Sequence, residues 1–228
     1  MLNDFFSHTI YPKSLLNFDD YPVVLDCGAN EGGFSVWANA NFNARCFGFE
    51  PDPRLYKKLI NKNNVTYYKV AIGHQEGEIM LNLGLEKCSS IRFSENNKKQ
   101  KSSLVKVINL EKFCSDNAIN KINLIKMDIE GAELDVLEGF SREFLAKTVS
   151  LTVEFHDFLN KSDLPRIRSI IKKMEMNGFF VLKLTYFTFG NVLMINQSLC
   201  KLTPTEKIFM FLYKYKAGIN RFLRKLKI

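Results

Sequence analysis

The sequence has 228 residues, a hydrophobic fraction of 46% and an aromatic fraction of 13%. These values are typical of one globular domain with a sizeable core, and they exclude a disordered chain. No apolar run approaches the roughly 18 residues of a membrane span, and residues 1–6 lack the basic and apolar regions of a secretory signal. The five cysteines form no C-x-x-C pair, so we expect a reducing, cytoplasmic compartment and no structural zinc.

The first predicted strand, Val23–Gly28, is an apolar run that contains an acid, Asp26, and ends in a glycine-rich turn. Such a run is typical of a parallel strand that is buried on both faces. Gly28 allows a sharp turn and a close approach of the backbone to a ligand. Gly32 opens the next helix, which we expect to reach Ala40 and to direct its unpaired N–H groups at a ligand. Together these features predict a nucleotide site.

Two features indicate which nucleotide this site binds. Asn30 stands where the dinucleotide fingerprint requires a second glycine, and Asp26 would repel a pyrophosphate. An acid at this position suits a cationic ligand, such as the amino group and sulfonium of S-adenosylmethionine. The second predicted strand, Ala44–Glu50, also ends in an acid, and Glu50 follows Gly28 by 22 residues, close to the usual spacing of a ribose-binding carboxylate. The alternative is a generic doubly wound domain with two solvated acids.

The rest of the chain continues the alternation of strands and helices, with one interruption at residues 73–104. Pro53 begins a helix that we expect to reach Ile60. The interruption is polar, with candidate strands at Glu78–Gly84 and Leu104–Asn109. The last two strands are too close in sequence for a parallel crossover and must form a hairpin. The later strands are predicted at Val65–Ile72, Ile122–Ile129, Val149–His156, Phe179–Thr185 and Val192–Asn196, with helices at Leu110–Ala118, after Gly131 and at Leu164–Asn177.

This pattern predicts an α/β fold, the class I methyltransferase Rossmann-like fold. Five alternating strands and helices closed by a hairpin give a seven-stranded, mostly parallel sheet with a C-terminal antiparallel hairpin. We expect three segments: a cover segment at 1–20, a methyltransferase domain at 21–200 and a basic amphipathic C-terminal helix at 201–228.

Four stretches carry a family resemblance: V-L-D-C-G-A-N-E-G at 24–32, F-E-P at 49–51, K-M-D-I-E-G-A-E-L-D-V-L-E-G at 126–139 and V-E-F-H at 153–156. With them the chain resembles the FkbM-type methyltransferases over about Val23 to Asn196. The resemblance implies the family fold, S-adenosylmethionine as cofactor, and O-methylation of sugar or natural-product hydroxyls. Such a resemblance does not identify the acceptor.

Ionisable side chains follow four of the strands at the carboxyl edge, where ligands bind in this class of sheet. We expect Asp128 to contact the methionine end of the cofactor or the acceptor. His156 is the candidate general base, because an ordinary pKa near 6.5 suits proton uptake at neutral pH. Glu154 would orient His156 or bind the acceptor. The alternative for His156 is a structural side chain that only completes a hydrogen-bond network. The predicted cofactor-binding residues are Asp26, Gly28, Asn30, Gly32, Glu50, Pro51, Ala71, Ile72 and Asp128, with Ala71 and Ile72 against the adenine.

Four residues of this edge also have the donor types that suit Mg²⁺ or Mn²⁺. They are Asp128, Glu130, Glu154 and His156. Their spacing is not a metal-binding signature, so a divalent metal is possible but is not our prediction.

The end of the chain is basic and amphipathic. The net charge is +8, and seven basic residues from Lys207 onward, without any acid, account for all but +1 of it. Thr203 and Glu206 form a capping-box pattern at the start of a helix. An apolar stripe follows at Ile208, Leu212, Tyr215, Ile219, Phe222 and Leu226. This helix either packs on the domain or makes a peripheral contact with the inner face of an anionic membrane, and we favour the membrane.

The sequence therefore predicts an S-adenosylmethionine-dependent O-methyltransferase that acts on a hydroxyl of a sugar, glycan or glycolipid intermediate. The alternatives are an RNA methyltransferase and a non-catalytic module that binds cofactor or glycan. We do not favour a nucleic-acid partner, because the basic charge is concentrated in the tail and no aromatic and basic platform lies near the predicted pocket.

Overall fold

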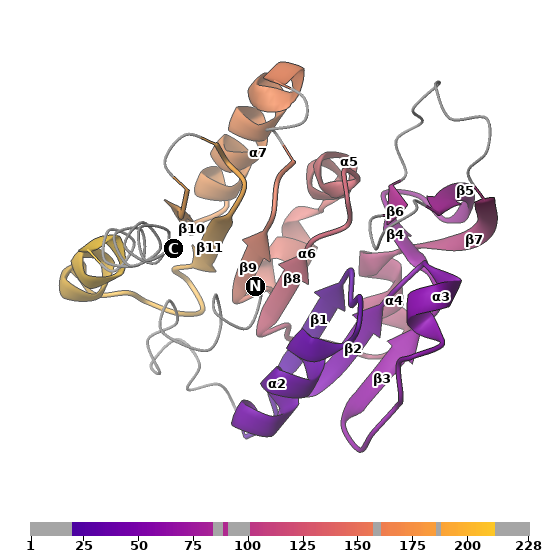
Figure 1. The fold of residues 1–228 in the computed structure, drawn as a ribbon. Helices are drawn as coiled ribbons and strands as arrows, with labels where there is room; N and C mark the ends of the chain where they lie inside the picture. Colours follow the sequence, from indigo (N-terminus) through magenta and orange to yellow (C-terminus); the bar gives the residue numbers. More distant parts are fainter. Residues whose placement is uncertain (1–19, 84–88, 91–100, 157–160, 186–187, 213–228) are drawn as a thin grey trace, which may run out of the picture.

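The computed structural model describes residues 20–212, except for 84–88, 91–100, 157–160 and 186–187. Its centre is a seven-stranded sheet with the order β10-β11-β9-β8-β1-β2-β3, in which β11 runs in the direction opposite to the other six strands (Figure 1). The strands are β1 (Val23–Cys27), β2 (Arg45–Phe49), β3 (Val65–Tyr68), β8 (Leu124–Met127), β9 (Ser150–Val153), β10 (Phe179–Lys183) and β11 (Val192–Asn196). The predicted class I methyltransferase fold and its closing hairpin are confirmed.

The strand order reverses direction beside β1, and this places the ligand crevice. The chain runs outward from β1 through β2 to β3 and then returns to β8, which pairs in parallel with the other side of β1. Ligands bind outside the carboxyl ends of the strands at such a switch point. The register of this pair sets Asp26 beside Lys126 and Cys27 beside Met127.

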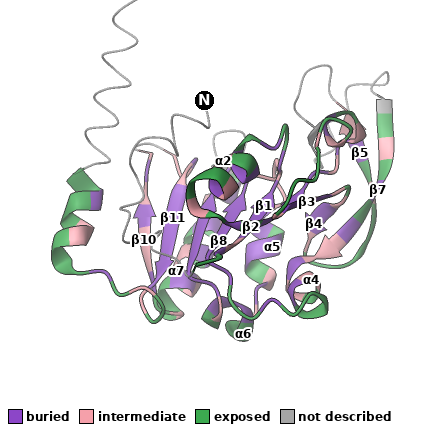
Figure 2. Cartoon of the chain, turned by 90° about the horizontal axis from the view of Figure 1, so that it is seen from below, coloured by how far each residue is buried: buried purple, intermediate pink, exposed green. Residues whose placement is uncertain are grey.

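Helices cover both faces of the sheet because successive side chains of each buried strand point to opposite faces. Leu25 contributes to a large core on one face, whereas its neighbour Val24 packs in a second core that includes Phe34 and Ala38 of α2. Figure 2 shows the resulting buried centre with exposed outer helix surfaces. The helices are α2 (Gly33–Phe42), α3 (Pro53–Tyr56), α4 (Leu110–Asp116), α5 (Glu133–Gly139), α6 (Arg142–Ala146) and α7 (Leu164–Met176).

The region after β2 differs from the prediction in two places. The strand expected at Val65–Ile72 is two strands, because β3 ends at Tyr68 and β4 (Ala71–Gly73) joins another sheet. The helix expected to reach Ile60 ends at Tyr56. The Ile60 side chain is exposed, so it makes no buried contact that would stabilise a longer helix. Helix α6 was not predicted.

The predicted interruption contains a second sheet of four strands with the order β4-β7-β5-β6. Its strands β5 (Gly77–Leu83) and β7 (Lys101–Asn109) form a long antiparallel pair, and β6 is the short strand Ser89–Ser90. Alternate side chains of these strands point inward, and a small core of Ala71, Leu81, Val105 and Val107 holds the sheet together.

The described chain ends in a helix at residues 204–212, which we call the 204–212 helix. The predicted capping box is present: the Glu206 N–H donates to Thr203 Oγ1 at 3.2 Å, and the Thr203 N–H donates to Glu206 Oε2 at 2.8 Å. Leu202 and Met210 pack into a cluster with residues of β10 and β11. Across the described residues, every helix is too short or too polar to cross a bilayer.

Gly28 is the position where the fold tolerates a side chain least. Its φ is +82°, and a Cβ built on it would lie 1.8 Å from the Asp128 carbonyl oxygen. Gly28→Ala should therefore lower the free energy of unfolding by about 2–5 kcal/mol, from left-handed strain and overpacking together. Urea denaturation measures this loss. Gly77→Ala is the control, because nothing lies within 4 Å of its Cβ position. Equal midpoints for the two variants would contradict the prediction.

Candidate active site

A hollow lies at the carboxyl edge of the sheet, between the ends of β1, β2 and β8. Seven of the predicted cofactor-binding residues line it: Gly28, Asn30, Glu50, Pro51, Ala71, Ile72 and Asp128. Apolar side chains of Leu55, Val70 and Leu81 complete one part of the wall, and Glu130 contributes to another. The hollow therefore has an apolar part beside β4 and an acidic part beside the end of β8.

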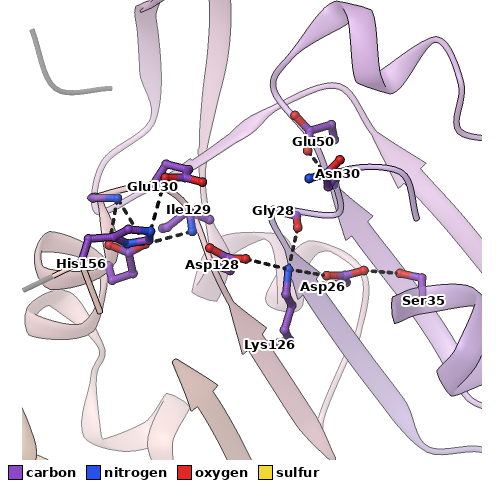
Figure 3. Close-up of polar contacts among 12 residues, drawn as sticks. Asp26, Gly28, Asn30, Ser35, Glu50, Lys126, Asp128, Ile129, Glu130 and His156 are labelled. Atoms are coloured by element: carbon purple, nitrogen blue, oxygen red, sulfur yellow. Dashed lines mark hydrogen bonds and ion pairs between the residues drawn. The ribbon is translucent and has the colours of Figure 1, made fainter. Parts of the chain in front are cut away.

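Glu50 is held rigidly in the wall of this hollow. The Asn30 N–H donates to its Oε2 at 2.7 Å, and the Asp52 N–H donates to its Oε1 at 2.8 Å (Figure 3 shows the contact with Asn30). Burial raises the pKa of Glu50 to about 7, although these two hydrogen bonds act in the opposite direction. Each oxygen keeps a second lone pair that can accept from a ligand hydroxyl.

The expectation that Asp26 contacts a cationic ligand needs correction. Its side chain is completely buried, so it does not reach the hollow. Ser35 Oγ donates to Asp26 Oδ2 at 2.7 Å, and Lys126 Nζ lies 3.4 Å from Oδ1 (Figure 3). The Asp26 side chain lies in the interior because neighbouring elements enclose the inward-facing positions of β1. The Lys126 ammonium balances its negative charge.

Lys126 is the residue that connects Asp26 to the hollow, and it was not singled out from the sequence. Its Nζ donates to the Gly28 carbonyl oxygen at 2.6 Å and lies 3.7 Å from Asp128 Oδ2. Burial alone would lower the pKa of Lys126, but the charges of Asp26 and Asp128 outweigh it and hold the pKa above its usual value. A lysine inside an apolar strand was the available signal, because a buried lysine is almost always paired.

Gly32 also has a different role from the one predicted. It is the N-cap of α2, and a Cβ at this position would lie 2.5 Å from the Tyr67 hydroxyl oxygen and 2.9 Å from Leu59. Tyr67 donates this hydroxyl to the Gly32 carbonyl oxygen at 3.2 Å. The glycine therefore allows α2 to pack closely against Tyr67 of β3, and it is not among the described residues that line the hollow.

The imidazole of His156 lies between two carboxylates, in the region left of Asp128 in Figure 3. Its Nε2 is 3.3 Å from Glu130 Oε2, and its Nδ1 is 3.3 Å from Glu133 Oε1. Burial favours the neutral ring, but the hydrogen bonds and charges of the two carboxylates outweigh it and raise the pKa of His156 to about 10. A ring with this pKa would carry a proton at neutral pH, which argues against the prediction that His156 takes one up there. Glu130 itself has a lowered pKa, chiefly because of its hydrogen bond to His156.

Glu133 supports this arrangement and was also missed. Its buried carboxylate accepts from the Ile129 N–H at 3.0 Å and from the Gly131 N–H at 3.0 Å. These bonds hold the turn after β8, where Glu130 has a left-handed φ of +54°. An acid in the first turn of a helix was the available signal, because such residues satisfy free N–H groups nearby. The turn in this way directs Asp128 and Glu130 to the hollow.

Asp128 and Glu154 are half-buried acids beside this turn. Burial raises the pKa of Asp128, with a further rise from Glu130, whereas the Lys126 ammonium lowers it. Burial and the charge of Asp128 likewise raise the pKa of Glu154. A raised pKa makes a carboxylate a stronger base than an exposed one. Strand β9 ends at Val153, so Glu154 and His156 lie in the segment after the strand and not within it.

Three of the four possible metal donors come together. Asp128, Glu130 and His156 each offer one ligand atom, and these atoms lie within 4.8 Å of one another; within the described residues Glu154 is outside this group. Carboxylates with one imidazole could coordinate Mg²⁺ or Mn²⁺. A metal ion would have to replace the proton of the His156 ring, which already balances the charge of the two carboxylates.

Comparisons with known proteins agree with the geometry. The family model for the Methyltransferase FkbM domain matches residues 26–181. The 2-O-methyltransferase NoeI of Sinorhizobium fredii is 30% identical over 69% of this chain and 72% of its own length. The hexuronic acid methyltransferase AglP of Haloferax volcanii is 25% identical over 66% of this chain and 62% of its own length.

Among solved structures, human methyltransferase-like protein 13, in complex with SAH, matches 90% of this chain and 85% of its own, at 10% identity and a TM-score of 0.48. The family model covers well over half of the chain and includes the turn after β1, the end of β2 and the turn after β8. The chain therefore belongs to the FkbM methyltransferase domain family, and it is a methyltransferase.

Proposed function

We propose that this methyltransferase uses S-adenosylmethionine to methylate a hydroxyl of a sugar, glycan or glycolipid intermediate. The observation that carries the proposal is the hollow itself, which joins a buried, rigidly held Glu50 at one end to Asp128 and Glu130 at the other. Two relatives whose names describe methylation support it, the 2-O-methyltransferase NoeI and the hexuronic acid methyltransferase AglP.

The residues that line the hollow fit the parts of this cofactor. Glu50 has an acceptor lone pair on each oxygen for the two ribose hydroxyls, since its other hydrogen bonds come from Asn30 and Asp52. Ala71 and Ile72 provide an apolar surface for the adenine ring. The acidic end near Asp128 favours the positive charge of the amino and sulfonium groups. When bound, the cofactor supplies an activated methyl group.

We propose that Asp128 takes up the proton of the substrate hydroxyl that becomes methylated. It lines the hollow, and its raised pKa gives it more basic strength than an exposed aspartate. The Lys126 ammonium, 3.7 Å away, attracts the carboxylate. Glu154 is available to accept a hydrogen bond from another hydroxyl of the same acceptor, while the His156 imidazolium orients Glu130. In this arrangement the protein positions both reactants and receives one proton.

The charge around the hollow favours a carbohydrate over a nucleic acid. Three carboxylates line the hollow, those of Glu50, Asp128 and Glu130, and Glu154 lies near Asp128. The described cations beside them are Lys126 and His156. Such an acidic surface repels a phosphate backbone. Carboxylates instead accept hydrogen bonds well from neutral hydroxyl groups. The RNA alternative is therefore disfavoured at this site.

The role of Glu50 gives a prediction about affinity. Glu50→Ala should weaken binding of S-adenosylhomocysteine by about 1.5–3 kcal/mol, the value of hydrogen bonds to a charged group. In the unchanged protein, affinity should fall as the pH is lowered through about 7, because Glu50 then takes up a proton. Calorimetry at several pH values measures both effects.

The control for this experiment is Glu78→Ala, which removes an exposed glutamate of β5. It should leave the affinity and its pH dependence unchanged. If Glu50→Ala binds S-adenosylhomocysteine as well as the unchanged protein does, the ribose assignment fails. If NADH binds more tightly than S-adenosylhomocysteine, the cofactor proposal fails as a whole.

The acceptor class is tested with labelled S-adenosylmethionine and extracts separated into glycan, lipid and RNA fractions. Label should enter the glycan or glycolipid fraction, and Asp128→Asn should lower the initial rate by about 10²–10⁴-fold, the usual contribution of a general base. Asp116→Asn, an exposed residue of α4, is the control. Label in RNA alone would overturn the acceptor class, and an unchanged rate for Asp128→Asn would remove its role. Rates measured with EDTA and with added Mg²⁺ show whether a metal takes part.

The charge of His156 can be measured directly. Nitrogen NMR shifts of the imidazole should show a protonated ring at pH 7–8, and a signal missing in His156→Asn assigns it. Because the folded pKa of about 10 lies above the ordinary value of 6.5, the contacts with Glu130 and Glu133 stabilise the fold fully below pH 6.5. This contribution is lost as the pH rises through about 10. A neutral ring at pH 7 would return the role of general base to His156.

A further inference from the structure

A second cavity continues from the hollow, and we call it the side groove. It lies between α5 and the second sheet, which Figure 1 shows side by side, and its volume is about 570 Å³. Pockets of roughly 300–1,000 Å³ hold small-molecule ligands. Ile72 lines both cavities, and Ala132 of the side groove follows Glu130 of the hollow by two residues. The side groove therefore adjoins the hollow next to the turn after β8.

The side groove is open because Gly77, which lines it, has no side chain. Alternate residues of a strand share one face, so the inward-facing positions of β5 are Leu81, Ile79 and Gly77. Leu81 and Ile79 pack into the small core of the second sheet. Gly77 pairs with Val107 of β7, and nothing lies within 4 Å of its Cβ position. A side chain at this position would therefore enter the groove.

Contacts outside the side groove hold both of its walls in place. On one wall, the His74 ring packs so closely against Gly139 of α5 that a Cβ on this glycine would overlap it. Asn109 Nδ2 donates to the His74 carbonyl oxygen at 2.7 Å and fixes the turn before β5. On the other wall, Arg166 of α7 donates to Glu138 Oε2 at 2.6 Å. The groove is in this way formed before any ligand binds, as is usual for binding pockets.

The lining of the side groove is acidic and rich in hydrogen-bonding groups. Among the lining residues that the structure describes, none is a lysine or an arginine, and four are acids: Glu76, Glu78, Asp135 and Glu138. Such a surface repels phosphate, sulfate and uronate groups. Carboxylates accept hydrogen bonds from hydroxyl groups, and the Gln75 amide both donates and accepts them. Ile79 and Val107 add apolar contacts for the C–H groups of a sugar ring.

We propose that the side groove binds an uncharged sugar unit of the acceptor glycan, next to the unit that becomes methylated. This inference rests on the proposed function, because it assumes a carbohydrate acceptor in the hollow. With the reacting unit beside Asp128, the neighbouring unit would lie past Ile72, between α5 and the turn before β5. An acidic unit at this place would face carboxylates on both walls. The groove therefore selects uncharged glycans over acidic ones.

Gly77→Trp tests the side groove, because the new side chain fills it from a position where the protein leaves open space. The assay uses labelled S-adenosylmethionine and the glycan fraction of the extract at limiting concentration. The initial rate should fall at least about tenfold, since lost hydrogen bonds and contacts weaken acceptor binding. The affinity for S-adenosylhomocysteine and the melting temperature should stay unchanged, which separates an effect on the groove from effects on the hollow and on folding.

The control is Met80→Trp, which places the same side chain on the opposite face of β5, where Met80 is 45% exposed. It should keep the rate of the unchanged protein. An equal rate for Gly77→Trp would overturn the inference and leave the proposed function intact. So would weaker binding of S-adenosylhomocysteine by Gly77→Trp, because the loss would then arise in the hollow. If the unchanged protein labels no glycan, the proposed function fails, and this inference fails with it.

The charge of the bound unit is tested on the labelled glycan itself. Partial acid hydrolysis should release a labelled disaccharide that neither an anion-exchange nor a cation-exchange column retains. Label found only in retained disaccharides would overturn the proposal that the groove holds an uncharged unit.

Discussion

The site depends on one buried cation, the ammonium group of Lys126. It lies between Asp26 and Asp128 and donates to the Gly28 carbonyl oxygen at 2.6 Å. In this way a single side chain balances charge on the two central strands and fixes the turn between β1 and α2. A buried ion pair leaves an uncompensated charge when one partner is removed, so these groups must be present together. The position of Asp128 in the hollow is thus determined from inside the sheet.

A second set of charged side chains stabilises the turn after β8. Glu133 holds the N–H groups of Ile129 and Gly131, and the His156 ring lies between Glu133 and Glu130. The imidazolium keeps Glu130 ionised and directed, which a neutral ring would do less well. Charges from both sets of residues act on Asp128: the Lys126 ammonium lowers its pKa, and the Glu130 carboxylate raises it. The acidic end of the hollow is therefore a coupled set of charges.

The sequence predicted the main sheet well because its strands are short apolar runs with clear turn signals. The sequence also predicted that Glu50 and Asp128 lie at the same edge of the sheet, because the carboxyl ends of parallel strands meet there. Two features of the site depend on partners that are distant in sequence. One is whether Asp26 reaches the hollow or the interior, and the other is whether the His156 ring is neutral. The break between β3 and β4 was missed because residues 65–72 have the composition of one continuous strand, although Lys69 lies where the chain changes sheets. Local sequence patterns predict where the strands lie. They do not predict which distant residues surround an ionisable side chain and set its protonation state.

The second sheet has a consequence for dynamics. Among the residues that the structure describes, its own core has four buried side chains, far fewer than the large core of the main sheet. Regions with few buried contacts open at lower free energy than the rest of a protein, and amide hydrogen exchange reports such openings. Two of those four, Ala71 and Leu81, also line the hollow. A molecule bound in the hollow would therefore slow amide exchange most in β4 and β5. Binding would then be detected as increased local order in a sheet whose described residues contribute no charged group to the hollow.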